Sequence, residues 1–501
     1  MTNNKIIYII SFFSGFLSLA QEIIWMRLIS FVGMSVPQTF SYTLALFLIG
    51  IAIGAQIGKK ICKTNQNVKL NFLGQIFFIA ALTDILLILL VYAYSYFFSP
   101  SILVLGLCVV ICAAVRGIIF PMVHHVGTAT SKTGAQISNV YFCNVLGSAL
   151  APLLISFVAL DYLNTQQVYL FICLMTLVTA CLCIDNKKIQ LIYVVFMIFP
   201  VFLMTLPEKL FHEFSKNSYQ ENTYPSLVLE NKHGIIQVYN TKEDNVVFGA
   251  NVYDGKLNTN IFHNSNGIDR AYLLTALKPQ AEHVLVIGLS TGSWAKVLSL
   301  MPSIKKITII EINPNYIELI KMYPEVRGIL DDPRIEIVID DGRKWLKKND
   351  QKKFDIILMN TTWHWRAYGA NLLSQDFMHI IHSCLNKDGL AFYNTTQSMN
   401  AYATAHQVFP YVYQFKYFAL GANQQQKIIP STLKNNLCLL RDPVSQNAVF
   451  SNEEPCQKAA EIITQTPLIS YGNIKFNHGD RDLEVITDNN MITEFKYGKG
   501  L

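Results

Sequence analysis

The apolar and polar positions of the chain divide it into two parts of different character. Residues 1 to about 206 are almost wholly apolar, whereas residues 207–501 have the mixed composition of a soluble domain. The apolar part contains seven runs long enough to cross the roughly 30 Å of hydrocarbon in a bilayer. These runs lie at residues 6–31, 39–58, 71–98, 101–123, 137–160, 165–184 and 189–206. We therefore predict an N-terminal polytopic α-helical membrane bundle over residues 1–206.

Four charged side chains interrupt the apolar runs, namely Glu22, Arg27, Asp84 and Arg116. A charge is costly inside hydrocarbon, so each should face a partner or a polar cavity. Two interpretations fit. One is an ion pair, Glu22–Arg116 or Asp84–Arg116, that holds the bundle together. The other is a polar pocket for an acceptor molecule that resides in the membrane.

The second apolar run carries glycines at every fourth position, Gly50, Gly54 and Gly58. Small residues at this spacing allow two helices to approach closely. Within a bundle of several helices, the spacing favours internal packing over a dimer face, and a homodimer remains an open alternative.

The polar part contains a short apolar run, His283–Ile287, that is bounded at once by the glycine turn Gly288–Gly292. Ser293–Leu300 has the pattern of a helix, and a second apolar run, Lys306–Ile310, ends in Glu311. A strand, a glycine turn, a helix and a strand that ends in an acid are typical of a nucleotide-binding βαβ unit. The acid lies where a carboxylate can accept both ribose hydroxyls.

Two more apolar runs extend this pattern. Ile335–Ile339 ends in Asp340 and Asp341, and Phe354–Met359 ends at Asn360. An acid pair after the third strand is placed to hold an adenine amino group. Together with the glycine turn and the first acid, this pair indicates an adenosine ligand rather than a purely structural α/β unit.

Polar residues that follow the predicted strands should line one crevice, because ligands of open α/β sheets bind at the carboxyl ends of the strands. The strand predicted at Leu390–Tyr393 is followed by Asn394. We therefore expect one pocket to hold Asn360, Thr361, His364, Tyr393 and Asn394.

The remaining residues complete a layout of five segments. Alternating apolar and polar residues over 226–263 predict a small antiparallel sheet, and Tyr411–Leu420 predicts one further strand. The predicted segments are 1–206 for the bundle, 207–225 for a juxtamembrane linker, 226–263 for the β lead-in, 264–422 for a Rossmann-like α/β domain, and 423–501 for an extension of unknown role.

The composition agrees with a membrane protein and argues against a nucleic-acid partner and a metal. Hydrophobic residues make up 51% of the chain and charged residues only 15%, with a mean hydropathy of +0.31. The net charge of +6 is modest and there is no basic helix or aromatic RNA-binding signature, so no nucleic-acid partner is expected. Cys384, Cys438 and Cys456 are scattered and no Cys/His zinc spacing occurs, so no metal is expected.

Three segments of the polar part resemble one known family. IEINPNYIELIK (310–321), DDPRIEIVIDDGRKWL (331–346) and FDIILMN (354–360) resemble the spermidine synthase (polyamine aminopropyltransferase) family, within the wider class of S-adenosylmethionine-dependent transferases. The resemblance spans roughly residues 252–422 and includes Asp254-Gly255, which is similar to the family's early Asp-Gly hairpin. Residues 360–366 (NTTWHWR) resemble a membrane-fused branch of the family.

This resemblance implies a donor and the residues that would bind it. The donor would be S-adenosylmethionine or decarboxylated S-adenosylmethionine. Glu311 would hold the ribose, and Asp341, beside Asp340, would hold the adenine. The loop around the sulfonium tail would be formed by Gly288, Ser290, Thr291 and Gly292.

At the reacting end the chain departs from the family's pattern. Thr291 stands where the family's glycine loop carries an aspartate that contacts the donor's amine, and Asn360 stands where the family has an aspartate that deprotonates the attacking amine. Asparagine cannot accept a proton. We predict His364 as the substitute general base, because histidine accepts protons near neutral pH, with Asn360 and Tyr393 as further catalytic residues. His364→Ala should abolish turnover and leave donor binding intact.

The acceptor side carries aromatic residues and one certain cation instead of acids. Trp363 and Trp365 could cradle an ammonium through cation–π contacts or pack an apolar acceptor. A putrescine dication needs carboxylates to replace its water, and residues 360–374 contain none. The predicted substrate-binding residues are Trp363, Trp365, Arg366 and Asn394.

These features predict a membrane-bound transferase that moves an aminopropyl group from the donor to an amine acceptor. The first alternative is methyl transfer from S-adenosylmethionine to a membrane-associated or amphiphilic acceptor, which the missing acids at Thr291 and Asn360 favour. The second is a catalytically inactive polyamine- or nucleoside-binding sensor or transport regulator. The expected partners are the donor, the acceptor and the lipid bilayer.

Two considerations disagree about the side of the membrane on which the polar part lies. Lysines mark the second, fourth and sixth loops as cytoplasmic, and seven spans would then put residues 207–501 outside. The donor, however, is made in the cytosol. We expect a multi-pass protein of the cell (inner) membrane with a cytoplasmic C-terminal domain, although the loop charges argue the other way. The lysines concerned are Lys59, Lys60, Lys63, Lys69, Lys132, Lys187 and Lys188.

Overall fold

The computed structural model describes residues 2–64, 68–128, 134–360, 362–475 and 482–501, with the side chains of residues 2–4 left out. Thr361 and Lys132, which the sequence singled out, lie outside the described residues. The chain divides into two compact units, Met1–Ile235 with Leu501 and Ile236–Gly500. The boundary falls inside the segment in which the sequence predicted a β lead-in.

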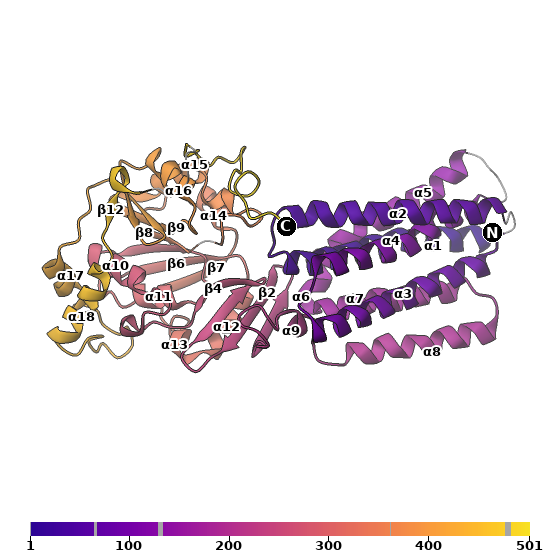
Figure 1. Ribbon diagram of the computed structural model, residues 1–501, viewed down its shortest axis with the longest axis horizontal. Helices are drawn as coiled ribbons and strands as arrows, with labels where there is room; N and C mark the ends of the chain where they lie inside the picture. Colours follow the sequence, from indigo (N-terminus) through magenta and orange to yellow (C-terminus); the bar gives the residue numbers. More distant parts are fainter. Residues whose placement is uncertain (1, 65–67, 129–133, 361, 476–481) are drawn as a thin grey trace. The chain divides into compact units, whose positions relative to one another are not determined.

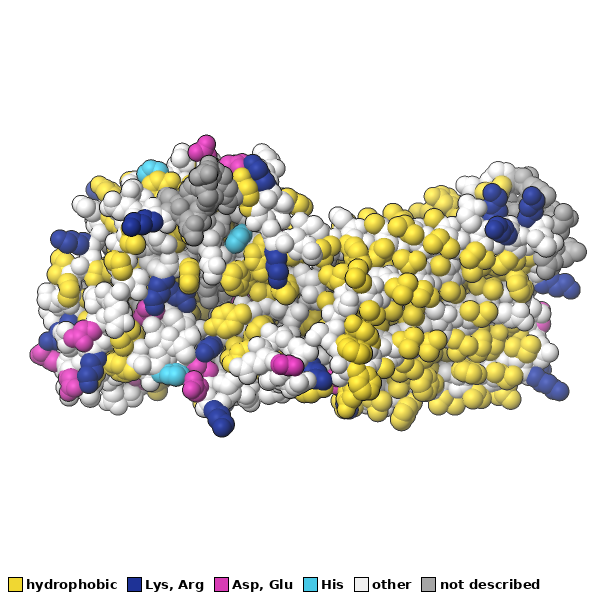
Figure 2. Space-filling view, viewed as in Figure 1, with side chains coloured by type: hydrophobic (Ala, Val, Ile, Leu, Met, Phe, Trp, Pro, Cys, Tyr) yellow, Lys and Arg dark blue, Asp and Glu magenta, His cyan; other side chains and the backbone are white. Residues whose placement is uncertain are grey.

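The first unit is helical, and seven of its described segments are long and apolar enough to cross a membrane. This agrees with the predicted helical bundle. Leucine, isoleucine and phenylalanine side chains cover its surface in Figure 2. Lysines of the second and sixth loops lie at one end of the unit, where α2 ends and α3 and α8 begin. The long helices are α1 (Thr2–Val32), α2 (Gln38–Thr64), α3 (Leu70–Phe97), α4 (Ile102–Gly127), α5 (Gly134–Leu154), α7 (Thr165–Leu182) and α8 (Lys187–Met204), and the short ones are η1 (Ile155–Ala159), α6 (Leu160–Tyr162) and α9 (Leu210–Phe214).

The glycines of α2 pack against α4 inside the unit. A Cβ atom on Gly54 would lie 2.0 Å from the carbonyl oxygen of Ala114, and a Cβ atom on Gly50 would lie 2.6 Å from the Cβ of Ala113. No side chain fits at such distances, so the small residues are needed for this helix contact. The prediction of internal packing is confirmed.

A buried ion pair links α3 to α4. Arg116 and Asp84 are 4% and 1% exposed, and their side chains form a salt bridge. The Tyr169 hydroxyl of α7 donates to the Asp84 carbonyl oxygen at 2.7 Å. Of the two pairs that the sequence allowed, the described residues therefore form Asp84–Arg116. Arg27, another charged residue of the apolar runs, lies 3.7 Å from the Glu230 carboxylate.

The second unit begins with a small antiparallel sheet, as the alternating pattern predicted. β2 (Gly234–Asn240) pairs with β3 (Asn245–Gly249), and β3 pairs with β4 (Val252–Lys256). The 3₁₀ turn η2 (Ile261–His263) follows β4, and β1 (Leu227–Asn231) precedes β2 in the chain.

An eight-stranded sheet forms the centre of this unit, in the order β12-β10-β11-β9-β8-β5-β6-β7. The neighbouring strands β9, β8, β5, β6 and β7 pair in parallel. The pairings of β11 with β9, of β10 with β11 and of β12 with β10 are antiparallel. β6 lies on one side of β5 and β8 on the other, so the chain reverses its winding direction at β5, which is where open α/β sheets bind ligands. The bounds are β5 (His283–Ile287), β6 (Lys306–Glu311), β7 (Ile335–Ile339), β8 (Phe354–Met359), β9 (Leu385–Asn394), β10 (Tyr411–Phe415), β11 (Phe418–Ala422) and β12 (Ile469–Ser470).

Helices cover both faces of this sheet (Figure 1), which confirms the predicted Rossmann-like domain. On one face α14 (Gly342–Lys348), α15 (Gln375–Ser383) and α16 (Met399–His406) bury a core that includes Ile357 and Phe377. On the other lie α10 (Asp269–Leu277), α11 (Ser293–Leu298), α12 (Asn315–Met322) and α13 (Pro324–Arg327). The 3₁₀ turns η3 (Ala370–Leu372) and η4 (Tyr471–Asn473) complete the connections.

The single strand predicted at Tyr411–Leu420 is wrong. The structure has two antiparallel strands there, β10 and β11, which pair from Tyr411 opposite Ala422 to Phe415 opposite Phe418. Lys416 forms the turn with φ of 53°. Lysine is uncommon at a positive φ, so the sequence carried no glycine or asparagine signal for this hairpin.

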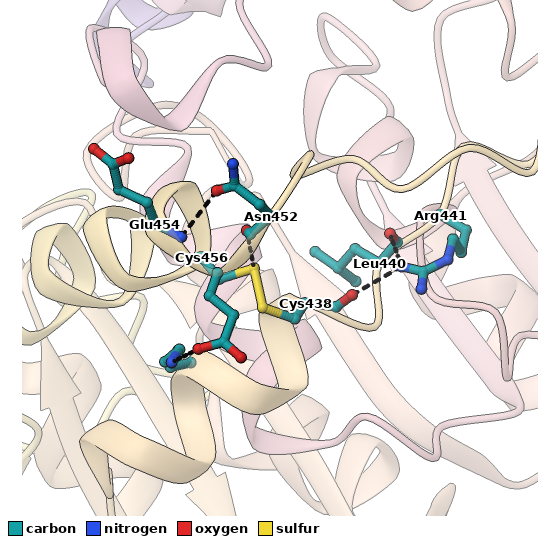
Figure 3. Close-up of a disulfide and its surroundings, with 8 residues drawn as sticks. Cys438, Leu440, Arg441, Asn452, Glu454 and Cys456 are labelled. Atoms are coloured by element: carbon teal, nitrogen blue, oxygen red, sulfur yellow. Dashed lines mark hydrogen bonds and ion pairs between the residues drawn. A yellow bond between two sulfur atoms is a disulfide. The ribbon is translucent and has the colours of Figure 1, made fainter.

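A disulfide joins the two helices of the C-terminal extension, α17 (Pro430–Leu437) and α18 (Glu453–Thr464). Cys438 and Cys456 are 18 residues apart in sequence, and their Cα atoms lie 5.5 Å apart (Figure 3). Arg441 Nη1 donates to the Cys438 carbonyl oxygen at 2.8 Å. The sequence showed these cysteines as scattered and did not predict the pair.

Candidate functional site

The glycine turn after β5 brings the ends of two strands together. Gly288 has φ of +87°, and a Cβ atom there would lie 3.2 Å from the Asn360 carbonyl oxygen at the end of β8. Gly292 has φ of +74°, and its hypothetical Cβ would lie 2.9 Å from a methyl carbon of Ile320. Glycine is the residue that adopts such angles without strain. The turn therefore allows a ligand to approach the backbone at the point where the sheet reverses.

A cavity of about 210 Å³ opens beside this turn, and we call it the glycine-loop cavity. Gly288 and Ser290, which the sequence placed in the loop around the sulfonium tail, line it. Thr291 and Gly292 are not among its lining residues; the Thr291 hydroxyl donates to Ser293 Oγ at 3.1 Å. The polar lining residues are Asp254, Ser290, Glu311, Tyr316, Asp340, Asp341, Asn360 and Thr362.

Glu311 is the buried acid of the glycine-loop cavity, with 4% of its surface exposed. Its Oε2 accepts the backbone N–H of Leu289 at 2.7 Å, and its Oε1 accepts that of Asn313 at 2.8 Å. Burial raises the pKa of this carboxyl to about 7, although the two N–H groups oppose the shift. The same bonds fix the carboxylate against the turn, which leaves its remaining lone pairs for hydroxyl groups of a ligand.

Asp340 and Asp341 line the same cavity from the end of β7. Asp341 caps helix α14, because its Oδ1 accepts the Lys344 backbone N–H at 2.7 Å. Asp340 Oδ1 accepts the Asp341 N–H at 2.9 Å. The structure thus brings the acid after the second strand and the acid pair after the third strand to one cleft. Their roles toward ribose and adenine stay predictions.

A second cavity, of about 240 Å³, adjoins the first, and we call it the arginine cavity. Four of the residues that the sequence predicted for the site line it. The sequence did not predict Arg270, Asn266 or Trp294 there. Asp254, Asn360 and Thr362 line both cavities, so the two meet at these three residues. The predicted residues found here are Asn360, Trp363, Arg366 and Asn394.

Asp254, on β4, is the acid at the border of the two cavities. Its Oδ2 accepts the Tyr316 hydroxyl at 2.6 Å and the Ser290 hydroxyl at 3.0 Å. Burial raises the pKa of the Asp254 carboxyl, while these two hydrogen bonds and the positive charge of Arg366 act against the rise. The Asp-Gly hairpin was the signal for this residue, but the sequence reasoning gave it no role in the site.

Three residues that the sequence predicted for the site line neither cavity: His364 and Tyr393 of the predicted pocket, and Trp365, a predicted substrate-binding residue. His364 Nδ1 lies 2.9 Å from the Thr396 carbonyl oxygen, and a carbonyl only accepts, so Nδ1 carries the proton and Nε2 is the basic nitrogen. Burial lowers the pKa of His364, which favours the neutral ring. Tyr393 is fully buried, and its hydroxyl donates to the Ala401 carbonyl oxygen at 3.4 Å. The catalytic roles of these residues stay predictions.

Residues 272–437 match the family model of the spermine/spermidine synthase domain. Two curated relatives are polyamine aminopropyltransferases. That of Bacillus subtilis (strain 168) is 34% identical over 115 residues, which cover 22% of this chain and 40% of that protein. That of Thermococcus onnurineus (strain NA1) is 29% identical over 151 residues, which cover 28% of this chain and 53% of that protein. The chain thus spans about half or less of the length of these relatives.

Solved structures that align with part of this chain include a spermidine synthase in complex with the transition state analogue AdoDATO. It aligns with 47% of this chain and 89% of its own, at 18% identity and a TM-score of 0.36. A spermidine synthase from Thermotoga maritima aligns with 55% of this chain and 85% of its own, at 17% identity and a TM-score of 0.34.

The family model covers the glycine turn, the two acid-bearing strand ends and the segment from Asn360 to Arg366. The C-terminal region of this chain therefore carries a spermine/spermidine synthase domain.

Proposed function

We propose that the C-terminal domain transfers an aminopropyl group from an adenosyl-sulfonium donor to an amine acceptor. The observation that carries this proposal is the pair of cavities that meet at Asp254, Asn360 and Thr362. A two-substrate displacement needs two sites that share a border, because the attacking atom must come within reach of the reacting carbon. The curated relatives, which are polyamine aminopropyltransferases, support the same class of reaction.

The donor's adenosine would occupy the glycine-loop cavity. Glu311 would accept the ribose hydroxyls, Asp340 and Asp341 would contact the adenine, and the Gly288–Ser290 turn would lie along the sulfonium tail. The positive sulfonium would then lie close to the border with the arginine cavity, where the Asp254 carboxylate can offset its charge.

The chemical step is a displacement at carbon. The lone pair of the acceptor nitrogen attacks the carbon next to the sulfonium, and the carbon–sulfur bond breaks with its electron pair left on sulfur. The products are the alkylated acceptor and 5′-methylthioadenosine. The nitrogen loses one proton, which a basic group of the protein takes up.

Two residues are candidates for this proton acceptor, since Asn360 cannot serve. His364 was predicted from the sequence, and its Nε2 is the basic nitrogen. Asp254 lines both cavities, whereas His364 lines neither, so we place the proton on Asp254. The rate of 5′-methylthioadenosine formation in Asp254→Asn and in His364→Ala distinguishes the two residues. The residue that takes up the proton is the one whose substitution lowers turnover far more, with donor affinity unchanged.

Methyl transfer from intact S-adenosylmethionine is the second candidate, and the arginines near the shared border favour it. Arg366 could hold the α-carboxylate that intact S-adenosylmethionine has and the decarboxylated donor lacks. In this case the transferred group is the methyl and the leaving product is S-adenosylhomocysteine.

Product identification distinguishes the candidates. The full-length protein in detergent is incubated with each donor and a panel of primary amines, and the nucleoside product is identified by mass spectrometry. We expect 5′-methylthioadenosine, which requires both decarboxylated donor and amine. S-adenosylhomocysteine would establish methyl transfer instead. Binding of donor or polyamine without either product would leave a sensor or transport regulator, and would overturn both transfer reactions.

We further propose that the seven long helices cross the membrane and that the C-terminal domain lies on the cytosolic side, where the donor is made. Their length and apolar composition support the crossing. The cytosolic side is supported by the reaction, because the donor is made in the cytosol and the domain needs it. The lysines of the described loops and the disulfide between α17 and α18 favour the opposite side.

A further inference from the structure

The arginine cavity carries more positive than negative charge. Two arginines line it, Arg270 and Arg366, and Asp254 is the one acid among its described lining residues. One oxygen of that acid already accepts hydrogen bonds from Tyr316 and Ser290. The cavity therefore has an excess of fixed positive charge at the place where the acceptor would bind.

Arg366 has hydrogen-bonding capacity that the protein does not use. Its Nη1 donates to the Gly249 carbonyl oxygen at 3.3 Å and to the Thr362 hydroxyl at 3.0 Å. Among the described residues, no carboxylate oxygen lies within salt-bridge distance of this guanidinium, and its Nη2 has no hydrogen-bond partner. Burial lowers the pKa of Arg366, while the neighbouring Tyr316 and Asp254 act against the shift.

Arg270 is held by backbone hydrogen bonds and aromatic contacts, and within the described part of the chain it forms no salt bridge with an acid. Its Nε donates to the Gly267 carbonyl oxygen at 2.8 Å and its Nη2 to that of Asn266 at 3.0 Å. The guanidinium carbon lies 4.9 Å from the ring centre of Trp294 and 4.7 Å from that of Phe418. The neighbouring acid in the chain, Asp269, forms its salt bridge with Lys416 instead.

A buried cation is stable only when an anion or hydrogen-bond acceptors compensate for the lost water. An arginine fork matches the two oxygens of a carboxylate. A diamine such as putrescine would instead bring two more positive charges into the cavity, and like charges repel strongly where water is partly excluded.

We propose that the arginine cavity binds a carboxylate group of the substrates, held by Arg366 and Arg270. This proposal rests on the transferase function proposed above and specifies its substrate class. The carboxylate has two sources: an acceptor amine that also bears a carboxylate, or the α-carboxylate of intact S-adenosylmethionine.

Two matched ligand pairs test the proposal by calorimetry on the full-length protein in detergent. Ornithine and putrescine differ by one carboxylate, and they are compared as acceptors with 5′-methylthioadenosine present at saturation. S-adenosylmethionine and its decarboxylated form differ in the same way and are compared as donors. We expect the carboxylate-bearing member of at least one pair to bind roughly tenfold to a hundredfold more tightly, as charge-assisted hydrogen bonds do. The pair that shows the preference identifies the source.

Arginine variants show whether the preference arises in this cavity. Arg366→Gln and Arg270→Gln should each remove most of the preference and leave 5′-methylthioadenosine affinity unchanged, which also shows that the variant is folded. Arg327→Gln is the matched control, because Arg327 is exposed and lines neither cavity, and it should keep the preference.

The inference fails if the wild-type protein binds putrescine and the decarboxylated donor at least as tightly as their carboxylate-bearing counterparts, or if the preference survives in both arginine variants. Failure of the wild-type protein to bind 5′-methylthioadenosine is a different result. It would overturn the proposed function itself, because in that proposal the nucleoside binds in the glycine-loop cavity and does not need the arginines.

Discussion

The Tyr316 hydroxyl donates a 2.6 Å hydrogen bond to Oδ2 of Asp254. This bond ties a residue of α12 to the acid that lines both cavities. Burial raises the pKa of Tyr316 well above its usual value, so the hydroxyl stays protonated and remains a donor at any physiological pH. The carboxylate of Asp254 is therefore held in one orientation at the border where the two substrates meet.

Asp254→Asn should lower the rate of transfer by about 10²-fold to 10⁴-fold, the usual contribution of a general base. The amide keeps the shape of the side chain but cannot take up the proton. Single-turnover formation of 5′-methylthioadenosine at saturating donor measures the effect. Asp331→Asn is the control, because Asp331 is exposed and lines neither cavity. A normal rate in the Asp254 variant would exclude its role as proton acceptor.

Tyr316→Phe should move the acidic limb of the pH–rate profile toward higher pH. The hydroxyl stabilises the ionised form of Asp254, so its loss raises the pKa of the carboxyl, and a higher pH is then needed to ionise the base. The profile of transfer rate against pH in the wild type and the variant measures the shift. A limb that stays in place would show that Asp254 does not control the rate.

Donor affinity should depend on the ionisation of Glu311. Its folded-state pKa is about 7, raised by burial from 4.5, and the ionised form accepts ribose hydroxyls better than the protonated form. The affinity for 5′-methylthioadenosine should therefore fall as the pH is lowered through 7 and level off above it. Calorimetry between pH 5.5 and 8.5 would show this, at roughly tenfold per pH unit below the pKa. Glu311→Gln should bind weakly with no such dependence.

The same pKa shift predicts a loss of stability at higher pH. Because the folded pKa lies above the unfolded value, the folded state holds the proton more tightly, and this contribution to stability is complete below about pH 4.5. It is lost as the pH rises through about 7. Bound donor should remove part of this loss, since it stabilises the ionised carboxylate. We would measure this loss of stability as the change in unfolding temperature of the C-terminal unit between about pH 4.5 and 7. The measurement is made with and without 5′-methylthioadenosine.

The stability of the helical unit should depend on the charges of Asp84 and Arg116 balancing each other, and not on either charge alone. Arg116→Met alone leaves a buried, unpaired carboxylate and should destabilise the helical unit by about 3–5 kcal/mol. The double variant Asp84→Leu with Arg116→Met removes both charges and should recover most of that loss. The yield of folded protein and its unfolding temperature in detergent compare the three proteins. Equal damage in the single and double variants would mean that the charges serve a function beyond packing.

The C-terminal domain should lie on the cytosolic side of the membrane. Because the proposed donor is cytosolic, a reporter fused after Leu501 should be active on the cytosolic side, and Cys438 and Cys456 should react with thiol reagents in cells. A reporter active only on the other side, with the two cysteines oxidised, would agree with the loop lysines and the disulfide. Transfer from a cytosolic donor would then be untenable.

The core strands could be predicted from sequence because each is a short, uninterrupted apolar run. The predicted runs His283–Ile287, Ile335–Ile339 and Phe354–Met359 have the same bounds as β5, β7 and β8. The positions of Glu311 and Asp340 could be predicted together with these strands. Each residue lies at the carboxyl end of a parallel strand, and these ends line the ligand crevice of an open α/β sheet. This part of the site depends on local sequence.

The rest of the site depends on contacts between distant segments. Asp254 reaches the border from a separate small sheet, and Arg270 comes from a helix that precedes the first core strand. Arg270 has no local pattern that points to a cavity, and the Asp-Gly hairpin at Asp254 does not by itself show which cavity the side chain reaches. The disulfide is similar, because the pairing of Cys438 with Cys456 depends on how α17 packs on α18. His364 shows the reverse case: its place in the chain suggested the pocket, but it lines neither cavity and its Nδ1 lies 2.9 Å from the Thr396 carbonyl oxygen, so its catalytic role stays a prediction.

Direct observation of a bound nucleoside would test the central claim, namely that Glu311 and the Asp340–Asp341 pair grip one adenosine. The measurement is a structure of the full-length protein with 5′-methylthioadenosine. The ribose hydroxyls should lie within hydrogen-bond distance of Glu311, with the adenine beside Asp340 and Asp341. Density for the nucleoside elsewhere, or an empty glycine-loop cavity at saturating ligand, would contradict the proposed transferase.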